Sequence, residues 1–153
     1  MFQSLSVVWE EMLRPLVQRP HRVQVAALCW RPAASGGEEV LLITSRDTGR
    51  WILPKGWPID GKDGAQSALQ EAWEEAGVTR AAIDPEPVGR YRYNKGLDHG
   101  GTVPVETLVY RVRVEALADD YPEAGERRRR WVSPKRAAVM VREPQLRDIL
   151  GKL

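Results

Sequence analysis

The segment from Asp63 to Gly77 constrains the fold more than any other part of the sequence. Asp63 and Gln66 form a capping pair, nothing interrupts a helix from Ala65 to Ala76, and Gly77 is a natural C-terminal cap. Small or apolar side chains share one side of this helix: Ala65, Ala68, Leu69, Ala72 and Ala76. Such a face predicts that the helix lies close against a sheet.

The other side of the same helix carries acids. Glu71, Glu74 and Glu75 fall within one sector, because positions i, i+3 and i+4 stack on one face. Three carboxylates in one turn repel one another unless a cation lies among them, and magnesium prefers oxygen ligands. Acidic helix faces also occur as ordinary solvated surface. The upstream segment Arg50 to Gly56 favours a metal site, because its glycine offers an unshielded backbone carbonyl near the acids.

Strands are predicted before and after this helix. Apolar, β-branched and alternating segments predict strands near residues 23–30, 40–44, 51–53, 88–94, 102–114 and 130–132. Prolines and glycines between residues 54 and 64 predict a loop. Ser133 and Pro134 begin a helix through Val141, and a last helix runs from about Pro144 to Leu150. This order predicts an α/β fold, with a mixed sheet sandwiched by helices.

Composition limits the class of protein. The 153 residues fit one domain at 22–153, preceded by a helical extension at 1–21 that could pack on the domain or support a homodimer. The longest apolar runs are far shorter than the roughly 20 residues that cross a bilayer, so no membrane partner is expected. A single cysteine, Cys29, excludes an internal disulfide and fits a reducing compartment. With no signal peptide recognised, a cytoplasmic location is expected.

With its surroundings, the acidic helix resembles the Nudix hydrolase superfamily, whose box reads G-x5-E-x7-R-E-U-x-E-E-x-G-U, where U is a bulky aliphatic residue. Gly56 takes the first glycine, Glu71 the glutamate after the arginine, Glu74 and Glu75 the acidic pair, and Gly77-Val78 the closing pair. The resemblance covers roughly residues 22 to 142. It implies a Nudix-type α/β/α sandwich with a mixed central sheet.

Three positions depart from the box. Lys62 stands where the pattern has its first glutamate, Gln70 stands where it has arginine, and Ala72 is smaller than the usual aliphatic residue. In the family, that glutamate and arginine are thought to orient the catalytic glutamate beside them. Both halves of the supporting ion pair are therefore missing, while the ligand-bearing acids remain.

The resemblance also implies a site. The carbonyl of Gly56 and the acids Glu71, Glu74 and Glu75 would hold magnesium, or manganese, and these acids would carry the catalysis. The general base is either a box acid or an acid from a later loop. The later acids, each otherwise an ordinary surface group, are Glu106, Glu123 and Glu126. Basic candidates for gripping substrate phosphates are Arg22, Arg46, Arg50 and Lys55.

Within the superfamily, the segment Leu53 to Pro58 looks most like the diphosphoinositol polyphosphate phosphohydrolase branch, whose members also take dinucleoside polyphosphates. Arg22 fits the basic residues of that branch, whereas Gln24 falls where a second one is expected. The expected function is metal-dependent hydrolysis of a diphosphate linkage in a small phosphorylated substrate. That substrate would be a nucleoside diphosphate-X compound, a dinucleoside polyphosphate or a diphosphoinositol polyphosphate.

Two other functions compete with hydrolysis. A catalytically weakened Nudix domain would act as a sensor that binds a nucleotide or polyphosphate without turning it over. An RNA-binding protein would use the run Arg127 to Arg130 and the tryptophans for stacking, but the net charge of only +2 argues against a nucleic-acid partner. Alternation along a strand predicts that the arginine run is a solvated strand edge.

Overall fold

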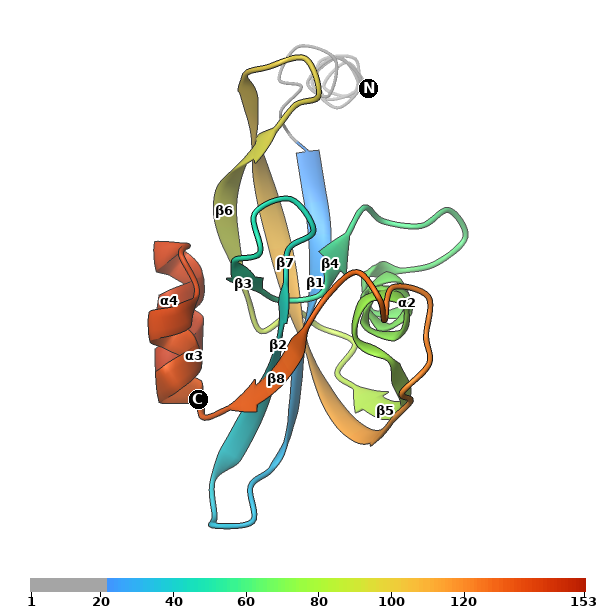
Figure 1. The fold of residues 1–153 in the computed structure, drawn as a ribbon, viewed down its shortest axis with the longest axis vertical. Helices are drawn as coiled ribbons and strands as arrows, with labels where there is room; N and C mark the ends of the chain where they lie inside the picture. The colour runs from blue at the N-terminus through green and yellow to red at the C-terminus, as the bar shows by residue number, and fades with distance from the viewer. Residues whose placement is uncertain (1–21) are drawn as a thin grey trace, which may run out of the picture.

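Eight strands form one mixed sheet in residues 22–153, the part of the chain that the computed structural model describes (Figure 1). The strands are β1 (Arg22–Pro32), β2 (Glu38–Thr44), β3 (Trp51–Ile52), β4 (Lys55–Gly56), β5 (Val78–Ile83), β6 (Gly89–Gly96), β7 (Thr102–Leu117) and β8 (Arg129–Val132). The main path runs β3-β2-β1-β7-β5, with β4 paired to β1, β6 to β7 and β8 to β2. Between β1 and β7 the pairing is parallel, while the other pairs are antiparallel.

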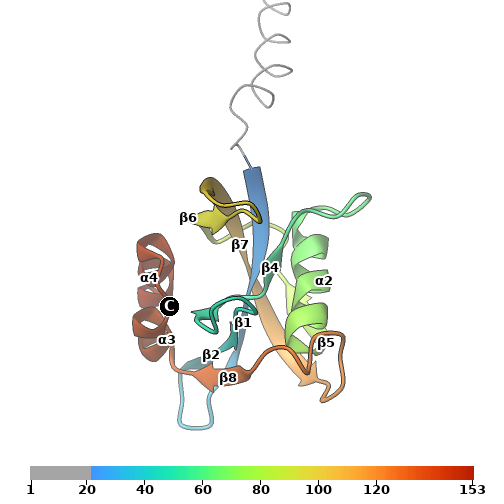
Figure 2. The same cartoon turned by 45° about the horizontal axis from the view of Figure 1, so that its top comes forward.

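Helices cover both faces of this sheet. Helix α2 (Gly64–Ala76) lies on one face, and α3 (Pro134–Met140) and α4 (Pro144–Gly151) lie on the other (Figure 2). Strand β1 is buried on both sides, since Val25 and Ala27 belong to the apolar cluster under α2 while Ala26 and Leu28 belong to the cluster under α3 and α4. The predicted α/β/α sandwich with a mixed central sheet is confirmed.

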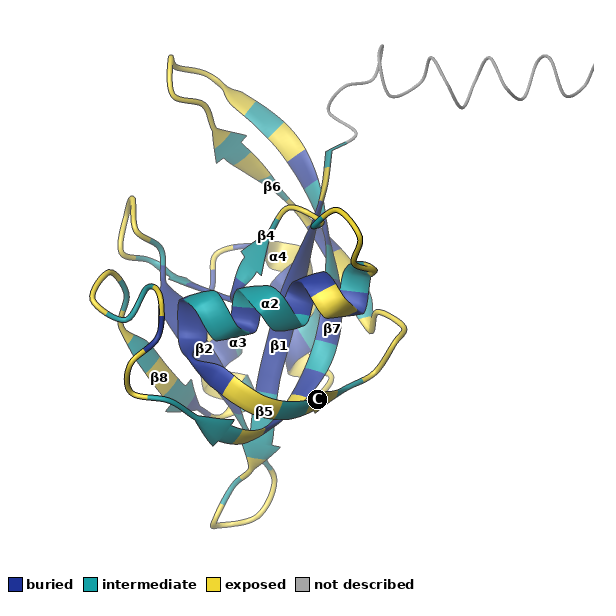
Figure 3. Ribbon diagram, turned by 90° about the vertical axis from the view of Figure 1, so that its right-hand side faces the viewer, coloured by how far each residue is buried: buried dark blue, intermediate teal, exposed yellow. Residues whose placement is uncertain are grey.

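Helix α2 has the bounds and the buried face that its sequence predicts. The side chain of Asp63 accepts from the backbone N–H of Gln66, and the side chain of Gln66 accepts from the N–H of Asp63, both at 2.8 Å. Gly77 closes the helix in the left-handed conformation, with φ at 76°. The face toward the sheet is buried (Figure 3) and consists largely of small residues, which are Ala65, Ala68, Ala72 and Ala76. Because these side chains are short, the helix backbone lies close to the sheet.

The structure adds two strands that the sequence did not predict. Strand β4 is only two residues long, and it forms inside the proline- and glycine-rich loop because Val25 and Ala26 of β1 offer it backbone partners. Strand β5 is rich in alanine, a poor strand former, and its pairing with β7 contains two register shifts. Both strands depend on tertiary partners rather than on local propensity.

Two expectations fall outside the described residues. The helical extension predicted for residues 1–21, and the homodimer contact that it suggested, lie in that part of the chain. Among the helices of residues 22–153, none is long and apolar enough to cross a membrane.

The C-terminal cap of α2 yields a stability prediction. A Cβ at Gly77 would lie 2.6 Å from the ring of Tyr121 and 2.9 Å from the carbonyl oxygen of Ala118, at a φ that disfavours any side chain. We expect Gly77→Ala to lower the free energy of unfolding by about 2 kcal/mol or more, as measured by urea denaturation.

Gly36→Ala is the matched control for this variant. Gly36 also has a positive φ, 98°, but nothing lies within 4 Å of its added Cβ. Gly36→Ala should therefore lower the free energy of unfolding by only about 1 kcal/mol, which is the cost of the backbone conformation alone. Equal losses at the two positions would contradict the proposed steric conflict at Gly77.

Candidate metal and phosphate site

The acids of α2 meet the loop before the helix at Gly56. A Cβ at this position would lie 2.6 and 2.7 Å from the two carboxylate oxygens of Glu71, so the carboxylate packs directly against the glycine backbone. The pairing of Gly56 with Val25 of β1 fixes this backbone from the other side. Only glycine fits here without displacing Glu71.

We call Glu71, Glu74 and Glu75 the carboxylate cluster. Glu75 is the most buried of these three acids. Its Oε1 accepts a hydrogen bond from the backbone N–H of Lys55 at 3.2 Å, and its Oε2 lies 3.4 Å from the guanidinium of Arg127. The side chains of Glu75 and Arg127 are 8% and 7% exposed. A buried carboxylate without such partners would be costly, so these contacts hold the charge in place.

The carboxyls of Glu71 and Glu75 are neighbours and are largely shielded from water. Burial raises the pKa of Glu71 to about 8, and the neighbouring Glu75 carboxylate adds to the shift. The pKa of Glu75 is also raised by burial, against the charge of Arg127 and the amide of Lys55. Burial and the closeness of the two carboxyls therefore both disfavour the doubly charged pair.

Glu74 points to a different partner. Its Oε2 accepts from the side-chain amide of Gln70 at 2.6 Å, while its backbone carbonyl accepts from the N–H of Glu123. As the side chains lie, no three acidic, cysteine or histidine groups within residues 22–153 converge on one point. The donor types, three carboxylates beside the backbone of Gly56, fit a hard divalent cation. Glu74 would have to leave Gln70 to join the other two acids.

The arginine run does not behave as a solvated strand edge, so that prediction is wrong. Arg127 binds Glu75, Glu123 and the carbonyl of Thr44, and Arg129 donates to the carbonyl of Ala76 at 2.7 Å, the last residue of α2. The neighbours Arg128 and Arg130 are exposed. The chain passes the end of α2 here, so alternate arginines turn inward to acids and carbonyls. Sequence spacing alone carried no signal for these partners.

The later acids differ in position. Glu123 accepts from Arg127 at 2.8 Å, so it shares that guanidinium with Glu75, and Glu126 pairs with Arg46 at 3.1 Å. Glu106 instead lies on β7, where it pairs with arginines of β6. Glu123 is therefore the later acid that the structure brings to the carboxylate cluster.

The four basic candidates do not form one group. Lys55 is adjacent to Gly56, and burial lowers the pKa of its ammonium to about 8. Arg46 lies at the edge of the cluster, 3.7 Å from Glu123. Arg50 pairs at 2.9 Å with the buried Glu143 before α4, and Arg22 begins β1, three residues before Val25.

Comparison with known proteins decides the family, because the model of the NUDIX domain matches residues 20–152. The chain belongs to the Nudix family. Members of this family generally use divalent metal ions. The carboxylate cluster of this Nudix domain is the part of the structure that carries the box residues Glu71, Glu74 and Glu75.

This Nudix domain is similar in sequence to hydrolases that carry different names. It is 36% identical over 118 residues to Nudix hydrolase 21, chloroplastic, of Arabidopsis thaliana, covering 75% of the chain and 57% of that relative. It is 29% identical over 135 residues to diphosphoinositol polyphosphate phosphohydrolase 3-beta of Homo sapiens, covering 85% of the chain and 76% of the relative. The chain spans little more than half the length of the first two plant relatives it matches.

Solved structures support the fold. The C. elegans Ap4A hydrolase superposes with a TM-score of 0.59 at 20% identity, covering 86% of this chain and 95% of the other. The NUDIX domain of Shewanella oneidensis NrtR, solved in complex with ADP ribose, gives a TM-score of 0.62 at 19% identity, covering 86% of each chain. At these identities the likeness establishes a shared architecture.

The Nudix domain also has a buried polar row that sequence reasoning missed. The hydroxyl of Tyr93 donates to Gln24 at 2.5 Å, Lys55 lies over the Tyr93 ring at 4.9 Å, and Glu143 is 4% exposed. Two buried atoms here, Thr107 Oγ1 and Glu143 Oε1, have no hydrogen-bond partner in the described residues, while Arg50 Nη1 has only its ion-pair contact with Glu143 Oε2. Buried polar atoms without partners commonly mark bound water or ligand.

The Glu75–Arg127 pair gives the prediction for this site. We expect Arg127→Ala to lower the free energy of unfolding by about 3–5 kcal/mol, because it leaves Glu75 buried without its cation. Urea denaturation of the metal-free protein measures the loss. Arg130→Ala is the control, since Arg130 is exposed two residues before the end of β8 and should change stability by under about 0.5 kcal/mol. A similar small effect at Arg127 would contradict a structural role for the pair.

Proposed function

We propose that this Nudix domain hydrolyses a diphosphate linkage in a small phosphorylated molecule with the help of a divalent cation, magnesium or manganese. The observation that carries the proposal is the contact of the Glu71 carboxylate with the backbone of Gly56, beside Glu75. Neighbouring acids of raised pKa favour a cation, because a cation offsets the repulsion between their charged forms. Membership of the Nudix family supports the same chemistry.

In this proposal each residue of the cluster has a distinct role. The Gly56 carbonyl and the carboxylates of Glu71, Glu74 and Glu75 would hold the cation, and a bound cation would supply charge neutralisation for the diphosphate and activation of the attacking water. Glu75 keeps its orientation through Arg127 and the Lys55 amide. The base is a box acid or Glu123, and the position of Glu123 beside Arg127 supports it over the other later acids.

Lys55 and Arg46, which lie beside the cluster, bind the phosphates of the substrate in this proposal. Arg50 and Arg22 would contact more distant parts of a substrate, and Arg50 would first have to release Glu143. The substrate class remains a nucleoside diphosphate-X compound, a dinucleoside polyphosphate or a diphosphoinositol polyphosphate. The names of the C. elegans and human relatives, and the ADP ribose of the S. oneidensis structure, support this range.

A sensor function is the second candidate. Gln70, in the place of the box arginine, holds Glu74 away from Glu71 and Glu75. A domain in which this hydrogen bond persisted would bind a phosphorylated ligand without cleaving it. We also propose a reducing, cytoplasmic setting from the lone buried Cys29, although relatives include proteins named chloroplastic and mitochondrial.

Phosphate release from a substrate panel tests the proposal. The panel contains diadenosine polyphosphates, nucleoside diphosphate sugars, nucleoside triphosphates and inositol pyrophosphates, each with magnesium and with EDTA. We expect turnover of at least one member with magnesium only, and a loss of about 100-fold or more in kcat for Glu75→Gln and Glu74→Gln. Glu86→Gln, at an exposed acid outside the cluster, is the control and should keep full activity. No release from any member, with ligand-induced thermal stabilisation intact, would favour the sensor.

The role of Lys55 is tested separately. We expect Lys55→Gln to raise the KM for the cleaved substrate by about ten-fold or more, because a charge-assisted contact to phosphate is lost. Lys135→Gln, on the exposed side of α3, should leave KM unchanged. An unchanged KM for the Lys55 variant would remove Lys55 from the phosphate site.

A further inference from the structure

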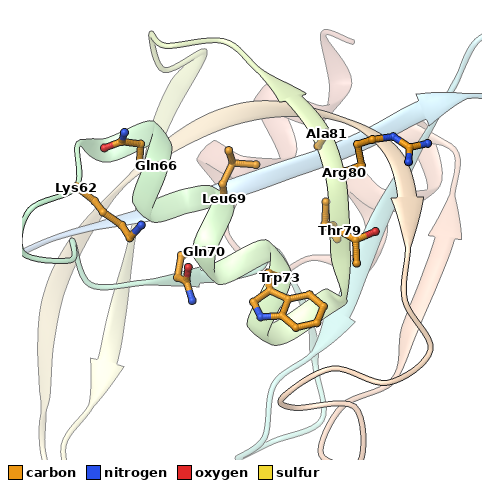
Figure 4. Close-up of a pocket in the computed structure, with 9 residues that line it drawn as sticks. Lys62, Gln66, Leu69, Gln70, Trp73, Thr79, Arg80 and Ala81 are labelled. Carbon is orange, nitrogen blue, oxygen red and sulfur yellow. The ribbon is translucent and has the colours of Figure 1, made fainter.

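A groove lies between the outer side of α2 and strand β5, away from the sheet face that α2 covers (Figure 4). Its volume is about 540 Å³, which falls in the range of small-molecule sites. The residues that line it are Lys62, Gln66, Leu69, Gln70, Trp73, Val78, Thr79, Arg80 and Ala81. We call this hollow the α2–β5 groove.

Trp73 gives the groove an uncovered aromatic surface. Among the tryptophans of residues 22–153, Trp30, Trp51 and Trp131 each have an arginine over the ring, at 4.5, 5.3 and 4.1 Å. Trp73 is half-buried, and no cation of the described residues covers it. Its indole lies beside β5 near Thr79 (Figure 4). An open aromatic face of this kind is suited to stacking a planar ring.

The charge along the groove is of one sign. Its lining contains two cations, Lys62 and Arg80, and no acid. Lys62 makes no ion pair within residues 22–153, and the ammonium points along the outer side of α2 toward Gln70 (Figure 4). Arg80 reaches outward beyond β5 and has only the exposed Glu115, at 3.9 Å, as a weak partner. The groove therefore has positive charge available for an anion.

Both charged departures from the Nudix box lie in this groove. Lys62 replaces the box glutamate and Gln70 replaces the box arginine, so one negative charge has become positive and one cation has become an amide. With Gln66, the groove then has two side-chain amides, which donate and accept hydrogen bonds, between its cation and its indole. The same two changes that weaken the box supply the polar groups of the groove.

We propose that the α2–β5 groove is a second ligand site, separate from the carboxylate cluster, and that its ligand is a nucleotide. The base stacks on Trp73, the amides of Gln66 and Gln70 contact the base or sugar, and the phosphate binds Lys62. A free nucleobase would lack the anionic part, and inorganic phosphate would lack the stacked part. The site adjoins the cluster at Gln70, whose amide also donates to Glu74.

Titration of the full-length, ¹⁵N-labelled protein with AMP in EDTA tests this site. The indole N–H resonance of Trp73 is identified by its absence in Trp73→Phe, and we expect it to shift and saturate with AMP. Adenosine and inorganic phosphate should each bind more weakly than AMP. Lys62→Ala should weaken AMP binding by about ten-fold.

The matched controls lie on α3, across the sheet. Lys135→Ala and Arg136→Ala remove the same types of exposed cation and should leave AMP affinity unchanged. A Trp73 resonance that does not move with AMP, or equal losses in the α3 variants, would overturn the proposal. Because chelator prevents turnover in this titration, its result stands apart from the phosphate-release assay, and failure of either one leaves the other intact.

Discussion

The close packing of α2 on the sheet is the constraint on which the rest of this structure depends. Alanine side chains form the buried contact, so the helix backbone lies near β1 and β7, and the rim of the helix comes level with β4. That placement brings the Glu71 carboxylate against Gly56 and the Glu75 carboxylate against the Lys55 amide. Larger apolar residues would have moved the acids away from the loop.

A buried ion pair then connects distant parts of the chain. Arg127 contacts Glu75 of α2, Glu123 in the preceding loop and the carbonyl at the end of β2. Such a pair stabilises little by itself, but loss of either partner leaves a buried charge. Arg129, the next arginine that points inward, donates a hydrogen bond to the carbonyl of Ala76, the last residue of α2. The C-terminal half of the domain thus fixes the acids that the central helix presents.

Local signals explain which parts of the structure could be predicted from sequence. The bounds of α2 follow from Asp63, Gln66 and Gly77. The helical spacing put Glu71 and Glu75 side by side, whereas Glu74 turns to Gln70 instead. Strands β4 and β5 could not be predicted, because one is two residues of a loop and the other is rich in alanine, and both form on partners far away in sequence. The inward turn of Arg127 likewise depends on where the chain passes α2, which no periodicity encodes. The hydrogen bond from Gln70 to Glu74 could not be predicted from the box pattern either, because the pattern gives only the spacing of the residues.

The partners of Glu75 have a consequence for how the domain is held together. Arg127 and the Lys55 amide satisfy this carboxylate from within the chain. In small domains nucleated by a metal, the ligands have no such internal partners, and the apo chain stays unfolded. Here the buried Glu75 carboxylate already has partners within the chain. The packing of α2 against the Lys55–Gly56 loop therefore needs no cation to hold Glu75 in place.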